Sequence, residues 1–449
     1  MFNEPSNTGW IPKAVSVLGA LILSFVAGSY ATEFDTFPYD PLIEPAFVAL
    51  KAVRERDRNI ERNVGDKSKP TGYCCVKRYD GRGLVKQLPE KSAGGYTLIA
   101  NGNRCGAKLL SEDGEVVHTW ELPFSEVWSS PPHIDDPVSD ENLSWRKVHL
   151  YPNGDVLAVY TARFNTDTPN GYGLVKVDAD SELIWRYPAH VHHDLDVAPD
   201  GTIYTLTHTF RSTAENPVLG DPRLGESKAG SRILEDFVLQ LSASGEKLQR
   251  ISIVEAMKRS PYAEAMQTVP SWDTLHTNNV DVITRAFARH HDFADPGDLM
   301  LSFRSLDAIA ILDVKKRRIA WMRMGSWREQ HDPDPLPNGH ILLFDNNGMK
   351  SSRIIEMNPD DGGIVWTYGA RDGTGFHSDV NGEQQRLPGG NVLVTESRSG
   401  RVFEVTPKRE VVWDYHTREV AKGEQYDYIA SILGAHRVPA SYLDFRPRE

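Results

Sequence analysis

Residues 330–348 read QHDPDPLPNGHILLFDNNG, and this stretch decides the fold. It places His331 ahead of a Pro-Asn-Gly turn at residues 337–339, and an apolar run follows at residues 341–344. Apolar strands joined by Asn-Gly turns are typical of β-hairpins. The stretch therefore predicts a strand, a tight turn and a second strand, with His331 where the first strand begins.

Two phrases of this kind recur along the chain. A turn that ends in glycine and leads into an apolar strand occurs at residues 152–157, 199–203, 337–341 and 388–392. One or two aliphatic or β-branched residues followed by tryptophan occur at Trp120, Trp185, Trp321, Trp366 and Trp413, with a weaker copy that lacks tryptophan at residues 245–251. The last two tryptophan spacings are 45 and 47 residues. A unit of about this length with about four strands is the size of a β-propeller blade.

The six copies of the second phrase predict an all-β fold, namely a six-bladed β-propeller. In such a fold each small sheet buries its faces only against its neighbours. A β-sandwich with coincidental turns is the alternative. The tryptophans occupy the same place in each unit, where large rings can fill the space between blades. We therefore interpret them as core residues and not as cofactor ligands.

The amino-terminal part predicts a membrane anchor. Residues 14–31 are an uncharged, mostly apolar run of 18 residues, long enough to span a bilayer as a helix. Lys13 precedes the run and acidic residues follow it. This charge pattern predicts a single-pass helix in the inner membrane, with the rest of the chain facing the periplasm. A cleaved signal peptide is the alternative, because Ser29-Tyr30-Ala31 has the small-x-small pattern of a cleavage site.

The sequence thus divides into a cytoplasmic tail (1–13), a transmembrane signal-anchor helix (14–31), a juxtamembrane helix and linker (32–92), and the propeller (93–449). The formal net charge of −12 argues against a nucleic-acid partner. Cys74, Cys75 and Cys105 have no metal-type spacing. They are thiols, or Cys74 or Cys75 pairs with Cys105 if the chain is exported.

Repeated polar positions predict a site. The positions eight residues before the glycine of the first phrase are Arg146, His193, His331 and Gly382. In a propeller the innermost strand begins near the central channel, so these positions point toward a common axis and form one candidate pocket. The repeat unit between those of His193 and His331 contains His276 and Asn278, which share one face of a predicted strand. It also contains Arg304, at the end of the next strand.

A zinc site is the alternative for this pocket, because three histidines can bind the metal. Arg304 argues against it, since a cation beside a metal ion is unfavourable without compensation. We therefore predict no metal and no cofactor. Asp194 and Asp332 directly follow two of the histidines. Strand alternation predicts that both carboxylates face away from the channel.

The specific phrases are His192-His193-Asp194, His276-Thr277-Asn278, Ser302-Phe303-Arg304, and above all Gln330-His331-Asp332-Pro333 with Leu336-Pro337-Asn338-Gly339 and Phe344-Asp345-Asn346. The closing strands at 400–405 and 411–415 add to them. Over residues 93–416 they resemble the bacterial arylsulfotransferase family, which uses no nucleotide sulfate donor. The resemblance implies a six-bladed propeller with its site in the central channel.

By this resemblance, His331 becomes transiently sulfated, His276 and Arg304 hold the sulfuryl group, and Asn278 accompanies them. The remaining family histidine falls on His193 or its neighbour His192, and spacing favours His193. Arg146 and His192 complete the candidates as substrate-binding residues.

The chemistry suits these residue types. Sulfuryl transfer resembles phosphoryl transfer, with a loose transition state and negative charge on the equatorial oxygens. A neutral imidazole is a nucleophile and then a leaving group, and arginine can hold two oxygens. The sequence therefore predicts transfer of a sulfuryl group from an aryl sulfate donor to a phenolic or other hydroxyl acceptor.

Two other functions compete. One is a non-catalytic, membrane-anchored propeller that serves as a scaffold, as a homodimer or within a membrane complex. The other is a quinone-dependent dehydrogenase, which would need a carboxylate metal site and a cofactor motif that the sequence does not show.

Overall fold

The computed structural model describes residues 73, 75–162, 171–212, 232–268, 273–346, 351–369, 375–423, 426–445 and 447, together with Leu23, Ser24 and Val26. The chain divides into two compact units, Met1–Lys67 and Ser68–Glu449. In the described part of the chain, no helix is both long and apolar enough to cross a bilayer. The predicted tail and anchor lie outside the described residues except for Leu23, Ser24 and Val26, which are helical.

The described residues of the second unit form seven antiparallel sheets, and six of these have four or five strands. From the inside outward, the first sheet consists of β28 (Ile432–Val438), β3 (Tyr96–Asn101), β4 (Gly106–Leu110) and β5 (Val116–Glu121), and the second of β6 (Leu143–Leu150), β7 (Val156–Ala162), β8 (Gly171–Val177) and β9 (Leu183–Tyr187). In the same order, the third sheet consists of β10 (Val191–Val197), β11 (Ile203–Ser212), β12 (Arg232–Leu241) and β13 (Lys247–Ser252), and the fourth of β14 (Thr277–Val282), β15 (Leu299–Phe303), β16 (Ala308–Asp313) and β17 (Arg318–Met324). The fifth sheet consists of β18 (His331–Pro335), β19 (Ile341–Asp345), β20 (Arg353–Met357) and β21 (Ile364–Gly369), and the sixth of β22 (Glu383–Arg386), β23 (Val392–Glu396), β24 (Arg401–Val405), β25 (Val411–His416) and β2 (Gly83–Gln87). The seventh has three short strands, β1 (Cys75–Val76), β27 (Asp427–Ile429) and β26 (Val420–Lys422). The described α-helices are short: α3 (Phe124–Val127), α4 (Ile253–Lys258) and α5 (Arg285–Ala288).

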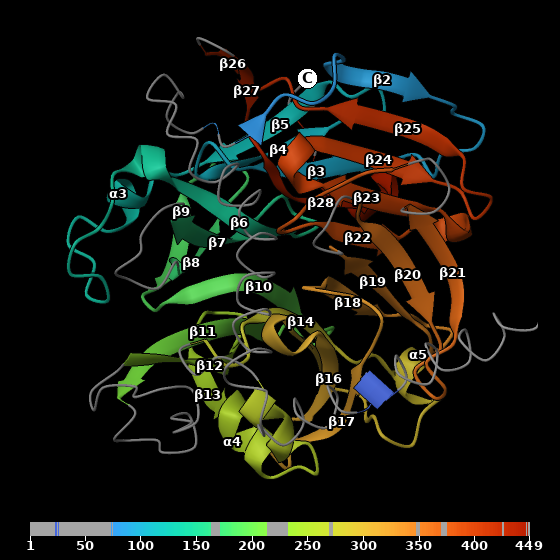
Figure 1. The fold of residues 1–449 in the computed structure, drawn as a ribbon. Coiled ribbons are helices and arrows are strands. Elements are labelled where there is room, and N and C mark those ends of the chain that lie inside the picture. Colours follow the sequence, from blue (N-terminus) through green and yellow to red (C-terminus); the bar gives the residue numbers. More distant parts are fainter. Residues whose placement is uncertain are drawn as a thin grey trace, which may run out of the picture. The chain divides into compact units, whose positions relative to one another are not determined.

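The six inner strands close into a ring. Each contacts the next in the order β6, β10, β14, β18, β22, β28 and again β6. Figure 1 shows these strands around the middle of the unit, with the later strands of each sheet farther out. The ring closes where the late strand β28 pairs with the early strand β3. The prediction of an all-β fold is confirmed. The count of six blades stays a prediction, because a seventh, smaller sheet is present.

The strand β2 lies in the segment that the sequence assigns to a linker. It pairs with β25 as the outermost strand of the sixth sheet. Ser92 Oγ donates to Glu404 Oε2 at 2.9 Å, and the N–H of Ala93 donates to Glu404 Oε1 at 2.7 Å. The compact unit therefore begins before residue 93. The polar, glycine-containing segment gave no sign of β2, in which only Gly83 is buried.

The cysteines differ from one another. Cys75, at the start of β1, is part of a disulfide. Cys105 is a buried thiol outside any disulfide of the described residues, so the bridge of Cys75 is not made with it. The alternative in which Cys75 pairs with Cys105 is wrong.

The repeated tryptophans lie on the fourth strand of their sheets. Trp120 and Trp413 are fully buried, Trp321 nearly so, and Trp185 and Trp366 pack against core clusters. Three indole N–H groups donate to a backbone carbonyl in a turn of the next sheet: Trp120 to Gly154 at 3.0 Å, Trp366 to Pro407 at 2.9 Å and Trp413 to Glu112 at 2.8 Å. The prediction of core residues is confirmed for Trp120, Trp321 and Trp413, whereas Trp185 and Trp366 are partly buried. The three tryptophans that donate also join one sheet to its neighbour.

The turn at residues 337–339 joins β18 to β19 as predicted. Gly339 has a φ of 85°, a left-handed conformation that other residues rarely adopt. A Cβ there would lie 2.8 Å from Cβ of His290. Glycine is therefore required by both the backbone and the packing.

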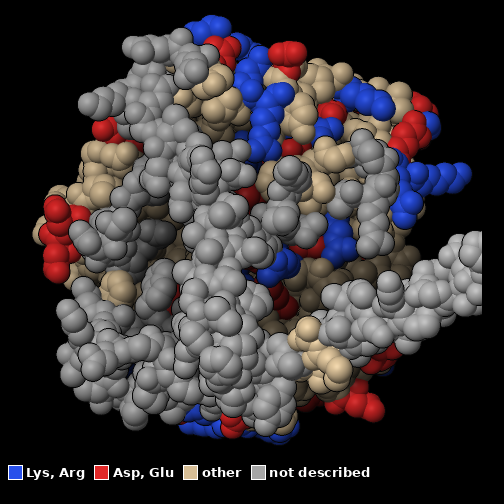
Figure 2. Space-filling model, viewed as in Figure 1, with Lys and Arg blue, Asp and Glu red and all other residues tan. Residues whose placement is uncertain are grey.

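The described surface mixes both signs of charge. Figure 2 shows Lys and Arg side chains lying among Asp and Glu side chains on the described part of one face. Exposed ion pairs include Lys91–Glu410 at 2.8 Å and Arg418–Glu115 at 2.6 Å. Such pairs contribute little to stability.

Candidate active site

The inner strands that carry the predicted site residues are irregular. The pairing register shifts between Trp145 and Val148 in β6, His192 and Leu195 in β10, Thr277 and Asn279 in β14, and His331 and Asp334 in β18. A β-bulge bends its strand and re-aims side chains, and bulges are frequent next to active sites. Arg146, His193 and Asn278 lie inside these bulges, and His331 borders one. The repeated bulge is thus the backbone feature that positions the predicted residues.

Left-handed backbone conformations gather at the same places. The φ angles are 57° at His193, 48° at His276, 51° at Glu329 and 53° at Asp332. Such residues each cost on the order of 1–3 kcal/mol and persist where the surrounding structure holds them. Their concentration around the predicted histidines indicates a site whose geometry is retained at the expense of stability.

His331 is held in one tautomer. Asn346 Nδ2 donates to the carbonyls of Ser378 and Asn381 at 2.8 and 2.6 Å, which turns its Oδ1 toward His331. His331 Nδ1 lies 2.8 Å from that oxygen and 3.0 Å from the carbonyl of Glu329. Because both partners are acceptors, Nδ1 carries the proton. Nε2 therefore keeps a lone pair that no proton blocks.

The surroundings also keep this ring neutral. Burial, reinforced by the positive charges of Arg146 and Arg304, lowers the pKa of His331 to about 3, although the hydrogen bond to Asn346 acts in the opposite direction. The side chain is 5% exposed. At neutral pH the ring is uncharged and lies in the field of two guanidinium groups, an arrangement that suits the binding of an anion.

His276 and Arg304 are each paired with a carboxylate. His276 Nδ1 donates to Asp273 Oδ2 at 2.5 Å, which leaves Nε2 for another partner. Arg304 begins the 3₁₀ helix η4 (Arg304–Leu306), and its Nη2 donates to Glu329 Oε2 at 2.8 Å. Glu329 thus contacts both sides of the site, with its carboxylate on Arg304 and its carbonyl on the ring of His331.

His193 lies close to His276, with ring centroids 5.2 Å apart. Its Nδ1 shares a hydrogen bond of 2.7 Å with Nδ1 of His192. Burial, together with the neighbouring His192, His276, Arg146 and His331, holds the pKa of His193 well below its ordinary value. The structure therefore brings the four predicted catalytic residues and Arg146 into one electrostatic neighbourhood.

Asn278 supports the backbone directly before His331. Its Nδ2 donates to the carbonyl of Gln330 at 2.9 Å, and the side chain is 4% exposed. Gln330 in turn donates to Ser302 Oγ at 3.0 Å and to the carbonyl of Ala308 at 2.8 Å. These bonds fix the backbone directly before His331. Part of the amide of Asn278 is thus used within the protein.

A second group of charged side chains, one from each of five inner strands, comes together around Lys147. Lys147 Nζ lies 3.2 Å from Asp194 Oδ1, 3.6 Å from Asp332 Oδ1 and 3.2 Å from Glu383 Oε1. Asp281, also from an inner strand, lies in the same group. Asp194 and Asp332 thus belong to an ionic group of inner-strand residues, and the bulges beside them break the strand alternation from which their direction was predicted.

Several important residues were not predicted from the sequence. Asn346 stands in the opening stretch, and Asp273 lies three residues before His276, so both were within view of the motifs. Glu329 precedes the motif by one residue. Lys147 follows Arg146 and offered no repeat of its own. Only their convergence in space identifies their roles.

A family model covers most of the chain that carries these residues. The model of the family described as arylsulfotransferase (ASST) matches residues 147–418, more than half of the 449 residues. The match contains His193, His276, Arg304 and His331, while Arg146 lies one residue before it. No curated protein sequence matches the chain.

Solved structures that match include a protein of unknown function from Bacteroides caccae, 12% identical, with a TM-score of 0.46 over 72% of this chain and 93% of that chain. A catalytically inactive virginiamycin B lyase from Staphylococcus aureus with quinupristin is 9% identical, with a TM-score of 0.36 over 68% and 86%. The WD40 β-propeller domain of Doa1 is 9% identical, with a TM-score of 0.40 over 83% and 98%. We base no conclusion on likenesses this remote. The family match confirms the resemblance noted in the sequence: the chain belongs to the arylsulfotransferase (ASST) family.

Proposed function

We propose that the chain transfers a sulfuryl group from an aryl sulfate ester to a phenolic or other hydroxyl acceptor through a sulfated His331. The observation that carries the proposal is the state of His331. Its proton is held on Nδ1 by Asn346 and the carbonyl of Glu329, its Nε2 is available, and its ring is neutral. Family membership supports the reaction type.

In the first step, the lone pair of His331 Nε2 forms a bond to sulfur while the bond from sulfur to the aryl oxygen breaks. The electron pair of that bond leaves with the phenolic oxygen. Positive charge develops on the imidazole, and the two acceptors on Nδ1 stabilise it. Arg304 and Arg146 hold the equatorial oxygens, where negative charge accumulates.

The leaving phenolic oxygen also needs a proton. His193 and His276 are the two candidates for this transfer, and the geometry favours His276. Asp273 on Nδ1 stabilises the imidazolium that forms when Nε2 of His276 holds a proton, as in hydrolase triads. His193 has no such carboxylate, and burial keeps its ring uncharged. We therefore assign the proton to His276 and a hydrogen bond to a sulfuryl oxygen to His193.

In the second step, the acceptor hydroxyl returns a proton to His276 Nε2, and its oxygen forms the new bond to sulfur. The bond from His331 Nε2 to sulfur breaks, and its electron pair returns to the ring. The cycle needs no cofactor. His192 and Asn278 position their neighbours in this scheme.

The setting of the reaction is part of the proposal. We propose that the six larger sheets are the blades of a propeller, and that residues 14–31 anchor it in the inner membrane with the site in the periplasm. The charge pattern around that run supports the orientation. A homodimer or a partner in a membrane complex is a further prediction from the sequence.

The test uses the full-length chain with p-nitrophenyl sulfate and phenol. We expect nitrophenol release, phenyl sulfate formation, and a sulfated His331 in peptides from enzyme quenched without acceptor. His331→Asn should abolish all three. Arg304→Met should lower kcat by about 10²–10³, which is typical of losing one oxyanion donor. Turnover by His331→Asn, or no turnover by the wild type with any aryl sulfate, would contradict the proposal.

A second comparison separates the two histidines. Nitrophenol is a good leaving group that needs little help from an acid. His276→Asn should therefore keep much of the first step with this donor and lose transfer to phenol, whereas His193→Asn should slow both steps together. The reverse pattern would mean that His193, and not His276, transfers the proton.

A further inference from the structure

A cavity of about 220 Å³ lies against the third sheet, and we call it the Arg250 cavity. Its lining comes from β11, β12 and β13, from the end of β9 and from the chain that leads to β10. None of the candidate catalytic residues is part of this lining. The Arg250 cavity is therefore distinct from the group of residues around His331.

The lining carries positive charge and no negative charge. Arg250 and Lys247 lie on it, and it includes no Asp or Glu, although the formal net charge of the chain is −12. Among the described residues, no carboxylate forms an ion pair with either side chain. Glu235, on β12, instead accepts from Arg211 Nε at 3.1 Å and from Ser252 Oγ at 2.6 Å. Two cations thus face the cavity without a counterion from the protein.

The protein holds Arg250 in a fixed position. Its guanidinium carbon lies 3.5 Å from the centroid of the Phe237 ring. Its Nε donates to Thr207 Oγ1 at 3.1 Å, and its Nη2 donates to Thr209 Oγ1 at 2.6 Å. A guanidinium remains charged in proteins, and its planar set of donors suits an anionic group with two or more oxygens.

The two threonine hydroxyls add further donors. Each oxygen already accepts a hydrogen from Arg250, and each hydroxyl also has one O–H of its own to donate. Neither O–H, nor Nη1 of Arg250, has an acceptor among the described residues. The Arg250 cavity therefore offers several hydrogen-bond donors and no ionised acceptor.

The rest of the cavity suits an apolar ring. Tyr187, Ala189 and Leu239 also line it, and Leu239 is 1% exposed. A cavity of about 150 Å³ with apolar walls is large enough to hold benzene. A volume of about 220 Å³ accommodates one ring together with a small polar group.

We infer that the Arg250 cavity binds a small aromatic anion, such as an aryl sulfonate or an aryl carboxylate. The anionic group lies on Arg250, Thr207 and Thr209, and the ring lies against Tyr187 and Leu239. Lys247 adds positive charge at an exposed position of the lining.

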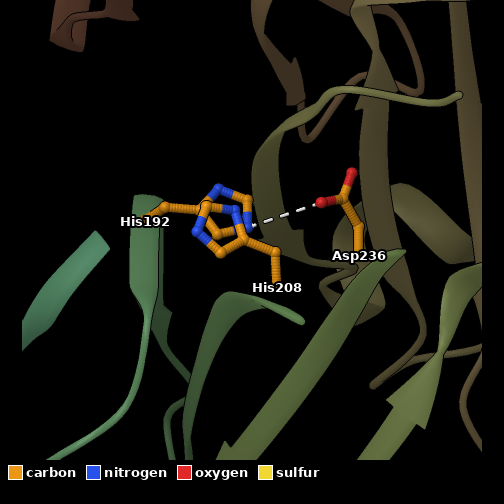
Figure 3. A group of neighbouring side chains, drawn as sticks. All are labelled: His192, His208 and Asp236. Atoms are coloured by element: carbon orange, nitrogen blue, oxygen red, sulfur yellow. Dashed lines mark ion pairs between the residues drawn. The ribbon is translucent and has the colours of Figure 1, made fainter. Parts of the chain in front are cut away.

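The third sheet separates this site from the candidate active site. Thr207 and Thr209 alternate with His208 along β11, which pairs with β12 without a register shift, so the His208 side chain projects from the opposite face. Figure 3 shows its ring stacked on that of His192 beside Asp236, and the two ring centroids are 4.3 Å apart. His192 Nδ1 in turn meets His193 Nδ1 at 2.7 Å. An anion on Arg250 thus lies across the sheet from the side chains that lead to His193.

The test measures binding of benzenesulfonate to the full-length chain by isothermal titration calorimetry. Its sulfur is bonded to carbon, so it has no sulfuryl group to transfer from oxygen. The measurement uses Arg304→Met protein, which lacks a cation of the candidate active site and keeps the Arg250 cavity. We expect saturable binding with a Kd at or below about 1 mM. Methyl phenyl sulfone, a neutral molecule of similar shape, and inorganic sulfate, which has no ring, should each bind at least about tenfold more weakly.

Substitutions in the Arg304→Met protein locate the site. Arg250→Met should weaken binding about 10–100-fold, as expected when a charged hydrogen-bond donor is lost. Lys247→Met changes an exposed residue, should fold normally, and should weaken binding about 2–5-fold. The matched control is Arg259→Met, because Arg259 is an exposed residue after α4 that does not line the cavity, and its Kd should stay within about twofold.

A second measurement locates the ligand directly. In crystals grown with p-bromobenzenesulfonate, the anomalous signal of bromine should lie beside Tyr187 and Leu239, and circular dichroism establishes that each variant folds. No saturable binding by Arg304→Met protein, equal affinity with and without Arg250, or bromine only beside His331 would overturn the inference. Equal or tighter binding of sulfate or of the sulfone would overturn the ligand class. These outcomes are independent of whether the chain transfers sulfuryl groups.

Discussion

Removing the charge of Lys147 is the sharpest test of what holds the ring of six inner strands together. One ammonium group lies within 3.2–3.6 Å of carboxylates from three other inner strands. Burial acts against its charge, but the carboxylates of Asp194, Glu383 and Asp332 raise the pKa of Lys147 well above its ordinary value. Lys147→Met removes the charge and keeps most of the volume. Several buried carboxylates would then face one another without a cation.

The expected loss is large and depends on pH. Removing one partner of a buried ion pair costs about 3–5 kcal/mol. Burial already raises the pKa of Asp332 to about 7 and raises that of Glu383, and Lys147 opposes both shifts. The variant should therefore have still higher values.

The direction of the pH effect follows from these shifts. A carboxyl group whose pKa is raised in the folded state stabilises the fold below its unfolded pKa of about 4, and that contribution is lost as pH rises through the folded value. The destabilisation of Lys147→Met should thus grow between pH 5 and pH 8.

Urea unfolding followed by tryptophan fluorescence measures the effect. We expect the loss in unfolding free energy to be greater at pH 8 than at pH 5 by more than about 1.4 kcal/mol, the equivalent of one pKa unit. Lys91→Met is the control, because Lys91 forms an exposed pair with Glu410 and should show little change at either pH. Equal losses at both pH values, or none, would refute the reasoning.

Three further substitutions test the site and the ring. Asn346→Leu should lower kcat about 10–100-fold in steady-state kinetics, because Nδ1 of His331 loses its fixed acceptor; an unchanged kcat would contradict the tautomer argument. Glu329→Gln should lower the KM for p-nitrophenyl sulfate, since Arg304 loses a competing carboxylate, and an unchanged or higher KM would count against that role. Trp413→Phe should reduce the free energy of unfolding by about 1–3 kcal/mol in urea, because a carbonyl in the neighbouring sheet loses its donor; a neutral effect would mean that the bond contributes little.

Local features of the fold could be predicted from the sequence. The turn at Gly339 and the strand after it depend on residues close together in the chain, so a short window contains the information. The tryptophans recur at one register position, and that recurrence indicated their burial. The strand β2 was missed because its partner, β25, lies more than 300 residues away in the sequence.

The candidate site residues could be selected from the sequence, but their hydrogen-bond and ion-pair partners could not. His331, His276, Arg304 and His193 carried enough local signal to be selected. The partners that set their chemistry, such as Asn346, lie on other segments or have common residue types. Alternation also gives no reliable direction for Asp194 and Asp332, because a bulge leaves no mark in a period-two pattern.

The carboxylates around Lys147 affect the charge of Arg146, and the charge of Arg146 affects the protonation of His331. Burial lowers the pKa of Arg146, but the carboxylates of Glu383, Asp194 and Asp332 act to keep it charged. The charge of Arg146, after burial itself, is the largest influence that lowers the pKa of His331. Without the carboxylates, a buried guanidinium would lack compensation, and without the guanidinium, the imidazole would take up a proton more readily. The neutral state of His331, on which the proposed attack depends, is thus maintained by carboxylates that have no part in the proposed contacts with the sulfuryl group.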